Sequence, residues 1–149
     1  MVLEKKLLRK SLDKKLNGLR KLTRLERPPQ GWVRTIREAL GMTTSQLAKR
    51  AGVTQPRIVS IEKNEENLKL STLSTIAEAL NCRLVYALIP EDSLENIIYN
   101  RAKEKAGLIL KKVNINMALE DQLVNTNELF DVCVQEVLND NPKCIWNDE

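Results

Sequence analysis

One short run joins side chains that can read base edges to a residue that favours a helix start: Thr54, Gln55, Pro56 and Arg57. A glutamine can form two hydrogen bonds with adenine, and an arginine can do the same with O6 and N7 of guanine. Proline suits the first turn of a helix, where its missing N–H costs nothing. We therefore predict a helix whose N-terminal end reads DNA in the major groove, with Ser60 one turn further on. The alternatives are a phosphate or solvent contact for Arg57 and a polar contact near the cap for Gln55.

Residues on either side of this helix can contact the phosphate backbone. Thr44 and Ser45 begin the preceding helix, where hydroxyls and free backbone N–H groups can bind a phosphate. Lys63 and Asn64 follow the reading helix on its other flank. Arg34 adds a candidate from an earlier helix, or else faces solvent. Such contacts would fix the register on DNA and make the affinity depend on salt.

The helices that position these residues are indicated by small and apolar side chains at fixed spacing. Ala48 allows two helices to cross closely, and Gly52 supplies left-handed geometry at the start of the turn between them. Val53, Ile58 and Ile61 then hold the second helix to the core. This register predicts two helices joined by a three-residue turn.

These residues resemble the helix-turn-helix of phage repressors and Cro proteins, the Xre family, from about Trp32 to Leu80. The resemblance implies a mainly α fold, a lambda-repressor-like helix-turn-helix bundle over residues 28–82. Arg37 and Glu62 stand where that family often has an ion pair between two helices. A paired, half-buried charge is poorly free to read DNA, so we expect this pair to hold the fold.

A wider resemblance covers nearly the whole chain. Residues 27–42, 84–90, 117–122 and 145–146 together look like the family called mobile mystery protein A. The resemblance implies an antitoxin or regulator encoded beside a Fic-domain protein, which makes such a protein a candidate partner. Inhibitors of Fic proteins usually carry Ser/Thr-xxx-Glu-Gly/Asn on a helix. The nearest match here runs from Ser74 to Ala79 and fails at its last position, which argues against direct inhibition by that route.

Residues 1–27 are expected to form a basic amphipathic helix that ends at the prolines of residues 27–31. Leucines recur at helical spacing, with lysines and arginines on the remaining faces. The leucines can pack on the body of the protein or on a second copy. The helix could instead follow DNA phosphates as a basic arm, or lie on a membrane surface. The leucines concerned are Leu3, Leu7, Leu8, Leu12, Leu16, Leu19, Leu22 and Leu25.

Residues 83–90 are rich in β-forming side chains and end at a proline, which predicts a single strand. One strand cannot pair its own backbone groups, and the chain offers no second good candidate. We therefore expect pairing with the same strand of a second copy in a homodimer. The residues that would pair are Leu84, Val85, Tyr86, Ala87 and Leu88.

Residues 91–149 are expected to form a C-terminal helical region. One helix opens at residues 93–96 and runs to Leu110, a further stretch includes Met117, Leu119 and Leu123, and another spans residues 126–138. Trp146 either docks in a pocket of the partner chain or packs on its own last helix. Acidic residues such as Glu65, Glu66 and those of the tail are most simply a solvated surface.

Composition excludes several function classes. The 149 residues include no histidine, which removes the commonest general base and the histidine-containing catalytic triads. The three cysteines, Cys82, Cys133 and Cys144, are too scattered for a zinc ribbon or a redox motif. We expect no enzyme activity, no metal and no cofactor. The charged first residues lack the apolar core of a signal peptide, and no apolar run could span a membrane, so we expect a cytoplasmic protein without membrane contact.

Charge is distributed unevenly along the chain. Net charge is +7 over residues 1–27, +2 over residues 28–110 and −5 over residues 111–149. The two ends are therefore suited to different partners, or to each other. Together, the sequence predicts a dimeric repressor or autoregulator that binds a palindromic double-stranded operator. The alternative is a protein-interaction module that neutralises a partner toxin, with DNA binding secondary.

Overall fold

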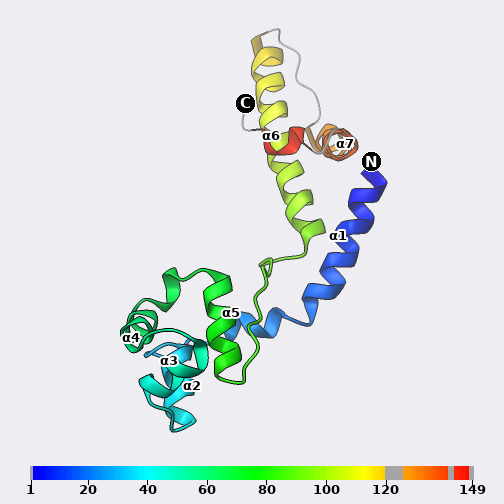
Figure 1. Cartoon of the computed structure of the whole chain (residues 1–149). Helices are drawn as coiled ribbons and strands as arrows, with labels where there is room; N and C mark the ends of the chain where they lie inside the picture. The colour runs from blue at the N-terminus through cyan, green and yellow to red at the C-terminus, as the bar shows by residue number, and fades with distance from the viewer. Residues whose placement is uncertain (1, 120–125, 141–142, 148–149) are drawn as a thin grey trace. The chain divides into compact units, whose positions relative to one another are not determined.

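The computed structural model describes residues 2–119, 126–140 and 143–147. Seven α-helices and three short 3-10 helices account for the regular structure of these residues, and no strand occurs among them. The chain divides into two compact units (Figure 1). Unit 1 combines residues 1–23 with residues 89–149, and unit 2 spans residues 24–88. The mainly α fold predicted from the sequence is confirmed, and each unit is described by itself below.

Unit 2 is built from four short helices around one apolar core. Its helices are α2 (Trp32–Ala39), α3 (Thr44–Ala51), α4 (Gln55–Lys63) and α5 (Leu70–Ala79). Helix α3 packs against both α4 and α5. Burial of large aliphatic side chains is the main favourable term for a domain of this size. The buried core residues are Val33, Leu47, Ala48, Ile58, Ile61, Ile76, Ala79 and Leu80.

The turn between α3 and α4 depends on Gly52. Its φ of 68° and ψ of 29° lie in the left-handed region, which costs a residue with a Cβ about 1–2 kcal/mol. The backbone N–H groups of Gly52 and Val53 both donate to the carbonyl oxygen of Ala48, which closes α3. Ala48 itself is buried where α3 meets its neighbours. The predicted pair of helices and the turn between them are thus confirmed.

The loop before α2 is fastened to the short helix η2 (Glu65–Asn67) by a buried carboxylate. Glu65 accepts from the backbone N–H of Trp32 at 3.2 Å and from Arg27 at 3.4 Å. Arg27 also pairs with Glu66 at 2.6 Å. Gly31 lies against Glu65 with a φ of 84°, so a side chain there would meet the carboxylate. The prediction that Glu65 belongs to a solvated surface is wrong, because its carboxylate binds the start of α2.

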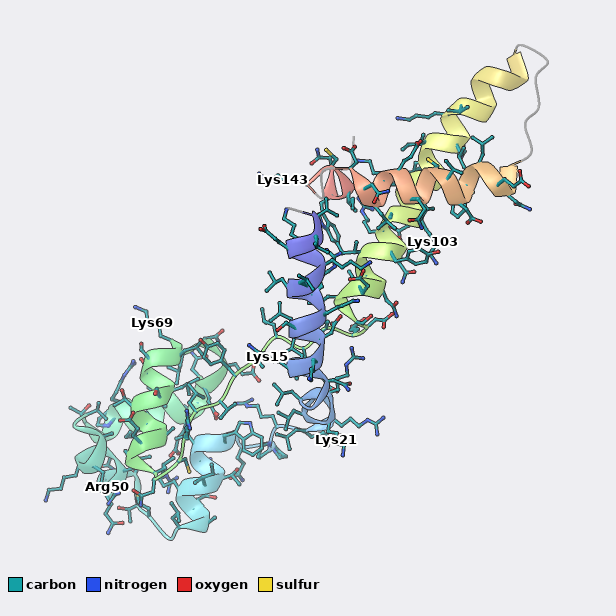
Figure 2. All side chains as sticks on the ribbon, turned by 90° about the vertical axis from the view of Figure 1, so that its right-hand side faces the viewer. Lys15, Lys21, Arg50, Lys69, Lys103 and Lys143 are labelled. Atoms are coloured by element: carbon teal, nitrogen blue, oxygen red, sulfur yellow. The ribbon has the colours of Figure 1, made fainter. Side chains whose placement is uncertain are left out.

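Unit 1 contains three helices with a core of smaller side chains. They are α1 (Val2–Asn17), α6 (Leu94–Leu119) and α7 (Thr126–Asn139), and α6 packs against both of the others. Helix α7 lies across α6 (Figures 1 and 2). The short helix η3 (Cys144–Trp146) closes the unit, with Ile145 buried against α6 and α7. The buried residues are Ala102, Ala106, Val134, Val137 and Ile145.

Helix α1 differs from the sequence expectation in two ways. It ends at Asn17, before Gly18 and the short helix η1 (Arg20–Arg24), rather than continuing to the prolines. It also meets α6 through polar contacts: Arg9 pairs with Glu95 at 2.9 Å, and Asp13 accepts from the backbone N–H of Leu94 at 2.8 Å. A carboxylate is favourable at this position because the first N–H groups of a helix lack partners. The leucines at positions 3, 7, 8 and 12 are consequently left exposed.

Residues 83–88 form no strand within the chain. None of their backbone groups makes a backbone hydrogen bond with the described residues. Val85, Tyr86 and Leu88 are strongly exposed, Leu88 to 91%. A strand exists only through its ladder of hydrogen bonds, and the part of the chain that the structure describes supplies no second strand for this one. Pairing with a second copy therefore stays a prediction.

The C-terminal helices are longer than the sequence indicated. Helix α6 continues without a break from Leu94 to Leu119, so it includes Met117 and Leu119, which we had placed in a separate stretch. Helix α7 covers the expected 126–138 region. Leu123 falls outside the described residues. Among the helices that are described, none is both long and apolar enough to cross a membrane.

Candidate nucleic-acid interface

Helix α4 turns its isoleucines inward and most of its polar side chains outward. Ile58 and Ile61 are fully buried in the core of unit 2, one turn apart. The face of α4 opposite these two residues must then point to solvent. Its exposed residues include Val59 and Lys63 and the five that the sequence predicted to read bases, Thr54, Gln55, Pro56, Arg57 and Ser60.

The helix begins at the predicted position, but its cap is unusual. Thr54 is the N-cap of α4, with extended φ and ψ of −79° and 153°, and its hydroxyl makes no capping hydrogen bond. Pro56 falls in the first turn, where proline is tolerated. The hydroxyl of Thr54 therefore stays available to an outside group.

Gln55 is held at the N-terminal end of α4 by the neighbouring helix. Its Nε2 donates to the hydroxyl of Thr44, the first residue of α3, at 3.0 Å. One amide hydrogen and the amide oxygen remain, which is the donor and acceptor pair that adenine requires. Thr44, predicted as a phosphate contact, thus positions Gln55 in this structure.

The N-terminus of α3 is capped through side chains. The Thr43 hydroxyl accepts from the Gln46 backbone N–H at 3.1 Å, and the Gln46 amide oxygen accepts from the Thr43 backbone N–H at 2.9 Å. This reciprocal pair is a capping box. Ser45, also predicted to meet phosphate, is exposed in the same turn. Gln46 is not among the residues predicted from the sequence, although its spacing from Thr43 is the capping-box signal.

Two further candidates lie at the C-terminal end of α4. Lys63 is exposed, and its ammonium pairs with no carboxylate among the described residues. Asn64 ends the helix, and its side-chain oxygen accepts from Asn67 at 2.7 Å. Lys63 therefore offers a free charge, whereas Asn64 is partly committed to the turn that follows.

Arg34 is paired within its own helix. Its guanidinium binds Glu38 one turn later at 2.8 Å, and both side chains are about half exposed. This hydrogen bond holds the pKa of Glu38 below its ordinary value, with a smaller coulombic contribution from Arg37. A phosphate would therefore have to compete with Glu38 for Arg34.

Arg37 and Glu62 meet in a bidentate pair between α2 and α4. The Nε and Nη2 atoms of Arg37 donate to the two carboxylate oxygens of Glu62 at 2.6 and 3.1 Å. Both side chains are nearly buried, with exposed fractions of 10% and 8%. The bond to Glu62 raises the pKa of Arg37 above its already high ordinary value. Nη1 donates to the carbonyl oxygen of Met42, so this guanidinium is occupied inside the unit.

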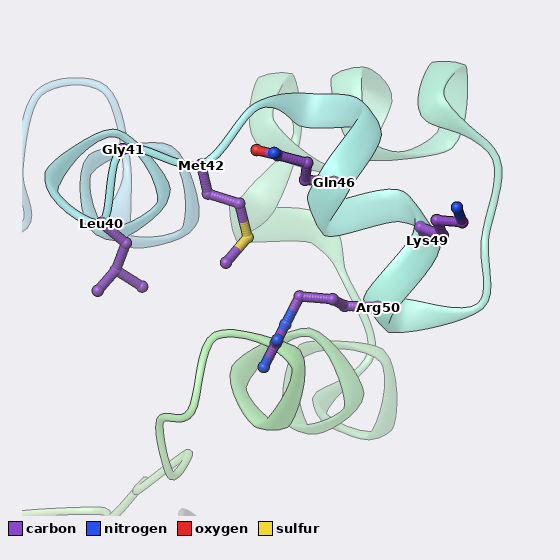
Figure 3. A pocket seen from close by; sticks show the side chains of 6 residues that line it. All are labelled: Leu40, Gly41, Met42, Gln46, Lys49 and Arg50. Atoms are coloured by element: carbon purple, nitrogen blue, oxygen red, sulfur yellow. The ribbon is translucent and has the colours of Figure 1, made fainter.

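A shallow hollow of about 540 Å³ lies beside α3, lined by residues that include Gln46, Lys49 and Arg50. Figure 3 shows Arg50 reaching from α3 toward a neighbouring helix. Its Nε donates to the carbonyl oxygen of Ala79 at 2.8 Å, and its Nη2 binds Asn81 at 3.2 Å. Arg50 thus binds the C-terminal end of α5, where a cation is favoured. The exposed Lys49 is the free charge on this side of α3.

The described residues hold little that resembles a catalytic centre. They contain no group of three or more aspartate, glutamate or cysteine side chains placed to hold a metal ion. The three cysteines are free thiols. Burial raises the pKa of the Cys133 thiol, and the nearby charge of Glu136 adds to this, so the thiol stays protonated.

This arrangement of α3, turn and α4 defines a helix-turn-helix domain. The family described as Helix-turn-helix matches residues 33–86 of the chain, which spans α2 to α5 and the segment after them. The chain is also 34% identical over 76 residues to the immunity repressor protein of Bacillus phage phi105. That alignment covers 49% of this chain and 52% of the phage protein, so the chain spans about half the length of this curated relative. No solved structure matches the chain.

Proposed function

We propose that this chain is a sequence-specific DNA-binding transcriptional repressor that regulates its own gene. The likeness to a phage immunity repressor and the helix-turn-helix match support this function. The observation that carries it is the exposed N-terminal end of α4. There Gln55 is fixed by Thr44 with its remaining donor and acceptor outward, and Arg57 is exposed close by.

Each residue has a distinct role in this proposal. Gln55 pairs with an adenine and Arg57 with a guanine, while Thr54 and Ser60 contact adjacent base edges and Pro56 stiffens the first turn. Ser45 and Lys63 bind phosphates on the two flanks of α4. Arg37 and Glu62 hold α2 to α4 and touch no DNA. Arg34 and Asn64 are weaker phosphate contacts because both already have partners.

Useful affinity requires two copies, because one such helix reads only a few base pairs. Two copies bind the half-sites of a palindrome about one helical turn apart. The backbone of residues 84–88, which makes no backbone hydrogen bond with the described residues, supports an antiparallel pairing of the two chains. Ala87→Pro removes one N–H of that edge and should weaken the dimer, which sedimentation velocity would measure.

The proposal is tested by titrating the protein against the DNA upstream of its own gene and against a scrambled duplex at two salt concentrations. We expect tight binding to the upstream DNA alone. Arg57→Ala should weaken it by about 1–3 kcal/mol, roughly 5- to 150-fold. Lys111→Ala, which removes an equal charge from an exposed position on α6, serves as the matched control and should change it little. Equal binding to both duplexes that vanishes at higher salt would show a purely electrostatic contact and contradict the proposal.

The second role, neutralising a Fic-domain partner, rests on the resemblance to mobile mystery protein A. Glu78 of the inhibitor-like stretch is exposed on α5, but the neighbouring Ala79 is buried in the core of unit 2. A partner would therefore have to reach Glu78 without opening the helix-turn-helix domain. Co-purification of the protein with the Fic-domain product of a neighbouring gene tests this role, and Glu78→Gln tests the route.

A further inference from the structure

Unit 1 leaves two apolar and charged stripes uncovered on different helices. The α1 stripe consists of residues three, four and seven positions apart, which share one face of the helix: Leu3, Lys6, Leu7 and Lys10. The α7 stripe has Leu129, Val132 and Glu136 at the same spacing, with Glu128 one turn before Val132. All eight side chains are exposed.

The two stripes carry opposite charges that nothing else in the described structure neutralises. Lys6 and Lys10 form no ion pair with any described carboxylate, and Glu128 and Glu136 form none with any described cation. Helix α1 contains six basic and two acidic residues, whereas α7 contains three acidic residues and no basic one. Each stripe therefore supplies what the other lacks: two charges of one sign beside two aliphatic side chains.

The polar docking of α1 explains why its stripe is free. Arg9 and Asp13 fasten α1 to the first turn of α6, which turns the leucines away from that contact. Leu3 is 68% exposed and Leu7 is 59% exposed, so most of both aliphatic side chains is in contact with water. On α7, Leu129 and Val132 are likewise exposed because the opposite face, with Val134 and Val137, fills the core. Adjacent exposed aliphatic residues of this kind mark an interaction surface.

We propose that the α1 stripe of one copy binds the α7 stripe of a second copy, and that the reverse contact forms at the same time. Two such contacts related by a twofold axis close a dimer, as isologous interfaces do. In each contact the two leucines of the α1 stripe pack against the leucine and valine of the partner's α7 stripe. The two lysines of the α1 stripe pair with the two glutamates of the α7 stripe. This inference shares the two-chain assembly with the proposed function and does not depend on DNA binding.

DNA is the less suitable occupant of the α1 stripe. Phosphates would bind Lys6 and Lys10 but would leave Leu3 and Leu7 in water. The acidic α7 stripe would gain nothing from DNA and would be repelled by it. A second copy satisfies both stripes at once.

The test uses two charge-reversed forms of the full chain. One carries Lys6→Glu with Lys10→Glu, and the other carries Glu128→Lys with Glu136→Lys. Sedimentation velocity without DNA gives the mass of each form alone and of their equimolar mixture. All four positions are exposed, and circular dichroism checks that each form keeps its helices.

We expect two-chain particles for the wild type and, at the same concentration, a clearly larger share of single chains for each reversed form alone, because the reversals leave the pairing of residues 84–88 intact. The mixture should again give two-chain particles, because a heterodimer pairs glutamates with lysines in both of its contacts. Salt should dissociate the wild-type dimer. Single chains in the wild type, an unchanged share of two-chain particles in either reversed form alone, no recovery of that share in the mixture, or growth beyond two chains would each overturn the proposal.

A final DNA-binding measurement separates this proposal from the proposed function. The Lys6→Glu, Lys10→Glu form should bind a duplex that carries one half-site as tightly as the wild type does. An unchanged mass together with lost half-site affinity would assign the lysines to phosphates and overturn the dimer contact. Failure of all forms to bind DNA, with the masses as expected, would overturn the proposed function alone.

Discussion

The two units of the chain bury apolar surface in opposite ways. Unit 2 encloses Leu47, Ile58, Ile61 and Ile76 almost completely, and its exposed residues on α4 are mainly polar. Unit 1 has a core of alanines and valines with one isoleucine, while leucines on α1 and aliphatic residues on α6 and α7 remain exposed. In unit 1 the apolar surface open to a partner therefore lies on the helices themselves, whereas in unit 2 its most exposed part, Val85, Tyr86 and Leu88, follows the last helix.

The largest effect is expected from removing a core side chain of unit 2. Leu47→Ala should destabilise the protein by about 2–5 kcal/mol, because the fully buried leucine would leave a cavity. Leu40→Ala in the same unit is the matched control, since Leu40 is 55% exposed, and should cost less than about 0.5 kcal/mol. Urea unfolding followed by circular dichroism measures both. Equal losses would mean that the core lies elsewhere.

Breaking the pair between α2 and α4 should come next. Arg37→Met leaves the Glu62 carboxylate nearly buried without its partner, at a cost of about 3 kcal/mol. The double change Arg37→Met with Glu62→Met should recover much of this loss, because two apolar side chains can replace a buried pair. Urea unfolding of the wild type, the two single variants and the double variant gives the coupling free energy between Arg37 and Glu62. A double variant as unstable as the sum of the single ones would show that the two residues act independently.

Two threonines at helix starts separate stability from DNA binding. Thr43→Ala removes the capping box of α3 and should cost about 1 kcal/mol of stability. Thr54→Ala removes a hydroxyl that makes no capping bond and should leave stability nearly unchanged. Operator affinity, measured by gel shift, should fall for Thr54→Ala. If Thr54→Ala destabilised the protein as much as Thr43→Ala, the hydroxyl would belong to the fold.

The smallest effect concerns the half-exposed carboxylate of Glu38. Its pKa in the folded protein is lowered from the ordinary value of 4.5, first by the hydrogen bond with Arg34. The stabilisation is therefore present above that value and is lost as the pH falls through the lower folded pKa. Titration of the carboxyl group by nuclear magnetic resonance should show the lowered pKa, and Arg34→Gln should bring it back toward 4.5. An unchanged pKa in that variant would assign the shift to Arg37.

The sequence predicted the local features of unit 2 well because each has a short-range cause. Gly52 must be left-handed to join α3 and α4, and the spacing of Ile58 and Ile61 sets which face of α4 is buried. The link between Gln55 and Thr44 joins residues eleven positions apart on two helices. It could be seen only once the crossing of those helices was known.

Features that depend on distant contacts were missed. Periodicity located leucines on α1 but could not tell that Arg9 and Asp13, rather than the leucines, would face α6. The burial of Glu65 depends on the return of the chain to Trp32, thirty-three residues earlier. Residues 83–88 have the composition of a strand, but composition does not supply a second strand.

The central claim is that the N-terminal end of α4 reads the operator. To test this, the affinity of the wild type and of Gln55→Ala is measured for every single-base-pair variant of the operator found in the DNA upstream of its own gene. We expect the wild type to lose about 1–3 kcal/mol of binding free energy when one adenine in each half-site is replaced. Gln55→Ala should no longer distinguish bases at that position and should still distinguish them at the others. A uniform loss at all positions, or an unchanged pattern, would contradict it.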